Sequence, residues 1–192
     1  MHPTSKAHRP DALAEMIPAA VTASIAARAD AEAVVEPKRR VTYRQLGELV
    51  NTWTRPMMAA GVQSGDRVAI WAPNGLGWIV AALGVQSAGA AIVPINTRFK
   101  GEEAAYVLSA SKAVLLVTTV GFLDTDTVGM LGAAEMPLPH LQRIVLLEGS
   151  AGVREVPKHT DVEPWHAFAR RAEGVSVAGV GATTERAADG HQ

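Results

Sequence analysis

The chain has 192 residues, of which 48% are hydrophobic and 19% charged, a composition typical of a globular protein with a buried core. Its formal net charge of -1 argues against a nucleic-acid partner, and the densest basic cluster, residues 38–40, is expected to be a solvated turn. The absence of cysteine excludes disulfides, thiolate catalysis and thiolate metal sites, and it is compatible with the cytoplasm.

Two short elements are expected at the start of the chain. Residues 16–27 are rich in alanine and predict a short helix, because Pro10, Asp11, Glu15 and Pro18 interrupt what would otherwise resemble a signal peptide. Residues 33–43 predict a β-hairpin with its turn at residues 37–39.

A long amphipathic helix is predicted from Thr42 to Ala60. Thr42 and Gln45 have the spacing of a capping box, apolar residues recur at helical intervals after them, and Gly61 is placed to end the helix. Pro56 interrupts this pattern, because proline has no N–H to donate within a helix. We expect a kink there.

Strands and helices then alternate, which predicts a parallel sheet with right-handed crossovers. The apolar window from Leu76 to Ile95 has the length of a membrane span, but glycines, Gln86 and Pro94 favour a buried helix followed by a buried strand. Strands are expected at 67–71, 90–95, 113–118 and 143–147, and helices at 75–87, capped by Asn74, and at 102–109.

The pattern weakens after Glu148. Residues 157–161 are typical of a loop, residues 163–171 predict a short helix, and residues 175–192 lack periodicity and are expected to be a disordered tail. The predicted organisation is therefore one partial domain over residues 1–174, with an ordered core at about 41–147.

Few residues are candidates for binding. Loops that follow parallel strands are where α/β proteins bind ligands, so Asn96 and Arg98 are substrate-binding candidates; Trp78 is interpreted first as a core anchor and second as a pocket wall. Residues 65–67 are interpreted as a structural turn. No catalytic residue is assigned and no metal site is expected, because the six histidines are scattered.

Five short motifs resemble, in order and spacing, the start of the adenylate-forming (AMP-binding) acyl-CoA synthetases, and most closely the fatty-acid and aromatic-acid CoA ligases. The resemblance implies an α/β fold with a Rossmann-like parallel sheet and flanking helices. The motifs are Thr42–Leu46, Gly61–Ile70, Pro73–Asn74 with Trp78, Ala88–Ala90 and Val93–Asn96.

The resemblance also implies a reaction: a hydrophobic carboxylic acid, ATP and CoA give acyl-CoA, AMP and pyrophosphate, with magnesium as cofactor. The family's glycine-rich phosphate loop, its later nucleotide-binding motifs and its C-terminal lysine have no counterpart in these 192 residues. We therefore expect a fragment that is inactive alone and that self-associates or needs a missing C-terminal half. The alternatives are a non-catalytic acyl-binding or protein-interaction module, and one subunit of a split ligase.

Overall fold

The computed structural model describes residues 17–147 and 156–173, so the expectation for residues 175–192 lies outside the described residues. The chain divides into two compact units, residues 1–48 and residues 49–192. Each unit is described by itself.

The first unit contains a helix and a hairpin, as predicted. Helix α1 spans Ile17–Arg28, and strands β1 (Glu32–Glu36) and β2 (Arg39–Thr42) pair antiparallel. Helix α2 (Tyr43–Ala59) begins here, with the predicted capping box: the Thr42 N–H donates to Gln45 Oε1 at 2.9 Å, and the Gln45 N–H donates to Thr42 Oγ1 at 3.3 Å.

The later turns of α2 belong to the second unit. The helix continues through the buried Pro56, whose carbonyl accepts from the Ala60 N–H at 2.8 Å. Gly61 follows with a φ of 86°, a left-handed conformation that glycine adopts without a steric penalty, so the predicted C-terminal end of the helix is confirmed.

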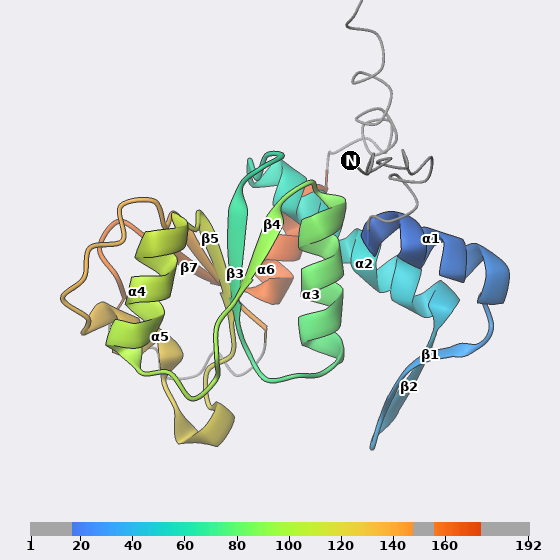
Figure 1. Cartoon of the computed structure of the whole chain (residues 1–192), viewed down its shortest axis with the longest axis horizontal. Coiled ribbons are helices and arrows are strands. Elements are labelled where there is room, and N and C mark those ends of the chain that lie inside the picture. The colour runs from blue at the N-terminus through green and yellow to red at the C-terminus, as the bar shows by residue number, and fades with distance from the viewer. Residues whose placement is uncertain (1–16, 148–155, 174–192) are drawn as a thin grey trace, which may run out of the picture. The chain divides into compact units, whose positions relative to one another are not determined.

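A five-stranded parallel sheet forms the second unit, in the order β4-β3-β5-β6-β7 (Figure 1). Helices α4 and α5 lie on one side of this sheet, and α3 and α6 lie on the other. The strands are β3 (Arg67–Trp71), β4 (Ala91–Pro94), β5 (Leu115–Thr118), β6 (Arg143–Leu146) and β7 (Asp161–Pro164), and the α-helices are α3 (Leu76–Ser87), α4 (Gly101–Ser111), α5 (Thr127–Gly132) and α6 (Trp165–Ala169).

The core fills both faces of the three central strands. All four residues of β5 are buried, as are the last four of β3 and the last three of β6. Side chains alternate between the two faces of a strand, so continuous burial requires cover on both sides. The predicted parallel α/β fold is confirmed, and the window that resembled a membrane span is α3 followed by β4.

Three details of the sequence interpretation are wrong. Asn74 does not cap α3, because Gly75 takes the N-cap position with no side-chain hydrogen bond. Residues 127–132 form α5, a helix that was not predicted. Residues 161–164, divided in the prediction between a loop and a helix, form the edge strand β7 beside β6.

Two 3-10 turns complete the described elements, at Phe122–Asp124 and Arg170–Ala172. Among the helices of the described residues, none combines the length and the apolarity that crossing a bilayer requires.

Candidate functional site

The carboxyl ends of β3, β4 and β5 are joined by hydrogen bonds from buried side chains. The indole Nε1–H of Trp71, at the end of β3, donates to the carbonyl oxygen of Asn96, just beyond β4, at 3.0 Å. The hydroxyl of Thr118, at the end of β5, donates to the carbonyl oxygen of Trp71 at 2.8 Å. The Thr127 hydroxyl, in the first turn of α5, lies 3.0 Å from that of Thr118.

These groups are buried, with Trp71 exposed by 1% and Thr118 by 0%. A buried polar group is costly when unpaired, and each one here has a partner. The network therefore fixes three adjacent strand ends at the edge of the sheet where α/β proteins commonly bind ligands.

The predicted pair Asn96 and Arg98 lies in the turn after β4, and both residues are exposed. The Asn96 side-chain Oδ1 accepts from the Arg98 N–H at 2.9 Å, and its carbonyl oxygen accepts from the Phe99 N–H at 3.0 Å. Asn96 therefore builds the turn, and Arg98 is the charged side chain that the turn presents.

The third candidate, Trp78, lies in the first turn of α3 and is half-buried. It does not belong to the buried core, so its interpretation as a core anchor is wrong. That place is taken by Trp71, which sequence reasoning did not single out. The sequence indicated Trp71 only as an aromatic residue at the end of the strand predicted at 67–71.

Residues 65–67 have the structural role that was predicted. Asp66 Oδ2 accepts from the Gln63 N–H at 2.9 Å, and Gly65 has a φ of 85°. The Arg67 Nε–H donates to the Ser111 carbonyl oxygen at 2.7 Å, which ties the start of β3 to the end of α4. The polar groups of this segment serve the turn and the strand.

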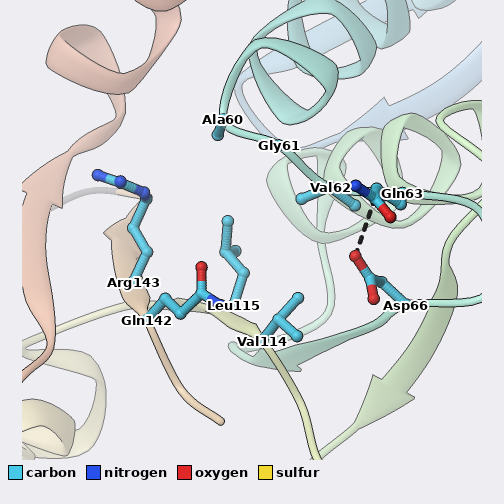
Figure 2. A pocket seen from close by; sticks show the side chains of 9 residues that line it. All are labelled: Ala60, Gly61, Val62, Gln63, Asp66, Val114, Leu115, Gln142 and Arg143. Carbon is cyan, nitrogen blue, oxygen red and sulfur yellow. Dashed lines mark hydrogen bonds between the residues drawn. The ribbon is translucent and has the colours of Figure 1, made fainter.

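A cavity of about 240 Å³ lies at the opposite, amino-terminal edge of the sheet, and Figure 2 shows Asp66 and Arg143 on different sides of it. Asp66 is held by Gln63, and Arg143 forms ion pairs with Glu163 and, at 3.5 Å, with Asp161. The Arg143 charge at this cavity is therefore paired with carboxylates, and the Asp66 carboxylate is engaged in its own turn. Its lining is Ala60, Gly61, Val62, Gln63, Asp66, Val114, Leu115, Gln142 and Arg143.

Metal-binding side chains do not cluster in the described part of the chain. Within residues 17–147 and 156–173, no group of three or more His, Cys, Asp or Glu residues could hold a metal ion. Asp126, one of the few carboxylates near the carboxyl edge, accepts from the Gly129 N–H at 2.9 Å and caps α5.

A comparison with known protein families identifies the family of the chain. The family described as "AMP-binding enzyme" matches residues 21–180. The chain belongs to this family. The resemblance found in the sequence motifs is thereby confirmed, and the match extends beyond the segment that carries those motifs.

A curated relative from Rhodococcus jostii (strain RHA1) is 37% identical over 139 residues, which cover 71% of this chain and 26% of the relative. It is a 3-[(3aS,4S,7aS)-7a-methyl-1,5-dioxo-octahydro-1H-inden-4-yl]propanoyl:CoA ligase. The chain thus spans about a quarter of the length of this relative.

Solved structures support the fold. An anthranilate CoA ligase in complex with anthranoyl-AMP superposes with a TM-score of 0.64 at 23% identity, covering 78% of this chain and 27% of that chain. A fatty acyl CoA synthetase from Mycobacterium tuberculosis gives a TM-score of 0.62 at 24% identity, covering 81% of this chain and 28% of that chain.

Proposed function

We propose that this chain supplies the opening strands and helices of the N-terminal domain of a carboxylic acid–CoA ligase. The observation that carries the proposal is 37% identity over 139 residues to a CoA ligase, together with the family match over residues 21–180. In the proposed parent reaction, the acid and ATP give an acyl-adenylate and pyrophosphate. CoA then displaces AMP and gives the acyl-CoA thioester.

The proposed substrate is a hydrophobic acid. The name of the Rhodococcus relative describes a propanoyl group on a fused bicyclic ring system, so a ring-fused propanoate is the first acid to test. A fatty acid is the second, supported by the likeness in fold to the M. tuberculosis fatty acyl CoA synthetase. The exposed turn at Asn96 and Arg98 gives no reason to prefer either acid.

The described residues do not fit magnesium-bound ATP by themselves. Transfer chemistry at ATP needs several preorganised donors around the departing phosphates. Here the Asn96 oxygens accept from the Trp71 indole and from the Arg98 and Phe99 backbone N–H groups, Asp126 caps α5, and the Lys100 backbone N–H donates to Glu103. ATP, magnesium and CoA are therefore proposed for the parent reaction, and no step is assigned to residues of this chain.

The 192 residues alone are proposed to be inactive in adenylation. Loss of a single preorganised donor commonly lowers a rate by about 10²–10³, and the sequence lacks the whole phosphate loop. Acid-dependent exchange of labelled pyrophosphate into ATP, measured with a ring-fused propanoate and a fatty acid, is expected to stay at background. Exchange above background that Arg98→Ala abolishes would overturn this proposal.

A chimera tests the ligase assignment directly. The 139 matching residues of the Rhodococcus relative are replaced by those of this chain, and acyl-CoA formation is measured with both acids. Retained ligation supports the proposal. A folded but inactive chimera would contradict it and favour the non-catalytic alternatives.

Those alternatives predict different measurements. An acyl-binding module would bind a labelled acid saturably without ATP, and a protein-interaction module would bind a partner without an acid. One subunit of a split ligase would gain exchange activity when mixed with a second polypeptide that carries the phosphate loop. A cytoplasmic location, where ATP and CoA are available, is proposed with the ligase function.

A further inference from the structure

We propose that Trp71 is a positioning residue, whose indole N–H holds the turn Asn96–Lys100 in place at the carboxyl edge of the sheet. The bond runs from Trp71 Nε1 to the Asn96 carbonyl oxygen and measures 3.0 Å. It joins the last residue of β3 to the first residues after β4, which are 25 positions apart in the sequence.

The other hydrogen bonds of this turn are local. The Arg98 N–H donates to Asn96 Oδ1, the Phe99 N–H to the Asn96 carbonyl oxygen, and the Lys100 N–H to Glu103 Oε2 at 2.8 Å. Local bonds fix the shape of the turn. The Trp71 bond, next to the backbone bond from the Ile95 N–H to the Ile70 carbonyl oxygen at 2.9 Å, fixes where that shape lies relative to β3.

Trp71 is itself held on several sides, so it can act as a rigid anchor. Its side chain is 1% exposed and packs in a cluster with Ala104 and Leu108 of α4 and Leu116 of β5. Its carbonyl oxygen accepts from the Thr118 hydroxyl at 2.8 Å. Trp71 therefore uses its backbone toward β5 and its indole toward the turn after β4.

The consequence concerns the presentation of Arg98. The Arg98 side chain is exposed on a turn whose shape is fixed by the Asn96 side chain and whose position is fixed by Trp71. Because the backbone that carries Arg98 is held in advance, less backbone entropy is lost when the side chain meets a ligand. This consequence for binding rests on the proposed function, whereas the anchoring by Trp71 does not.

The test is limited trypsin digestion of the whole 192-residue chain, because Arg98 and Lys100 are exposed tryptic sites in the turn. Trp71→Phe removes the N–H and keeps an aromatic ring. Cleavage after Arg98 and Lys100, relative to cleavage after Arg40 in the hairpin, is expected to rise about three- to tenfold, the range that follows from the net strength of one hydrogen bond. Ile144→Val is the matched control, since it removes one methylene from the same buried cluster and leaves the indole N–H and the Thr118 bond to Trp71 in place.

A second replacement separates the lost bond from lost packing. β-(3-Benzothienyl)alanine at position 71 keeps the shape of the indole but carries no N–H, and it is expected to give the same selective rise. An unchanged cleavage ratio with this replacement, or an equal rise in Ile144→Val, would overturn the proposal. The assay contains no acid, ATP or partner, so a failed ligation assay and a failed anchoring assay are distinguishable.

Discussion

At the scale of single residues, Gly84 shows how closely α3 approaches α2. A Cβ atom at this position would lie 2.4 Å from the Trp53 Cβ and 3.3 Å from the Thr54 backbone nitrogen. Atoms this close to a backbone cannot be relieved by a change of rotamer. Gly84→Ala is therefore expected to lower the free energy of unfolding by about 1–3 kcal/mol, the usual range for overpacking.

Gly77 is the matched control in the same helix. Its added Cβ would meet the Leu147 side chain at 3.7 Å, which is ordinary contact. Urea denaturation should find Gly77→Ala neutral or slightly more stable, because alanine favours a helix. Equal stabilities for Gly84→Ala and the parent chain would show that the two helices can separate without cost.

Replacing Pro56 with alanine is expected to raise the free energy of unfolding, whereas Gly84→Ala is expected to lower it. Proline within a helix costs roughly 3 kcal/mol relative to alanine, and Pro56→Ala removes this cost. The replacement also removes two buried methylenes worth about 1.6 kcal/mol, and it raises the conformational entropy of the unfolded chain, which lowers stability. The net expectation is a gain in stability of about 1 kcal/mol, read as a higher thermal midpoint. A lower midpoint would mean that the packing of the proline ring outweighs the lost helix bond.

At the scale of elements, aromatic side chains hold the short segment β7–α6 against the rest of the second unit. The rings of Trp165 and Trp53 stack with centroids 3.7 Å apart and an interplanar angle of 8°, and Phe168 is 0% exposed. Glu163 accepts hydrogen bonds from Arg143 and Arg171. These contacts attach the segment to both β6 and α2.

Trp165→Ala is expected to lower the free energy of unfolding by about 3 kcal/mol, the low end for a truncated buried tryptophan, because Trp165 is only half-buried. Near-ultraviolet circular dichroism should lose the signal of the stacked pair. Trp165→Phe retains a ring against Trp53 and serves as the control. Loss of the signal without loss of stability would show that the stack does not hold the segment.

At the scale of the whole molecule, the expectation of self-association can be examined through the sheet. A sheet cut off before its remaining strands would leave an uncovered apolar face and an open edge, yet both faces of β3, β5 and β6 are buried. Both edge strands, β4 and β7, are four residues long and end in proline, which cannot donate a ladder hydrogen bond. Within the described residues, the sheet therefore favours a monomer.

Sedimentation velocity decides between the two expectations. A single monomeric species at high micromolar concentration is the result that the burial pattern favours. A sedimentation coefficient that rises with concentration would support self-association. The exposed Phe122 and Leu123 would then be the first residues to replace with aspartate, since Leu123 is 68% exposed.

The sequence by itself determined the features that depend on neighbouring residues and on periodicity. The Thr42–Gln45 capping box, strand β3 at Arg67–Trp71 and the turn at residues 65–67 were all predictable, because each is specified by residue types a few positions apart. The motifs in the same stretch also carried the family, which the comparisons confirm.

Only the tertiary structure decided what depends on contacts between distant segments. Strand β7 has one neighbour and contains a single strongly apolar residue, Val162, so its pattern is that of a loop until β6 supplies its hydrogen bonds. The sequence likewise could not identify the partner of the Trp71 indole, since that partner is a backbone carbonyl just beyond the neighbouring strand, 25 residues away. Backbone carbonyls are identical in every residue, so their pairing with a side chain is a property of the fold and leaves no trace in the residue types.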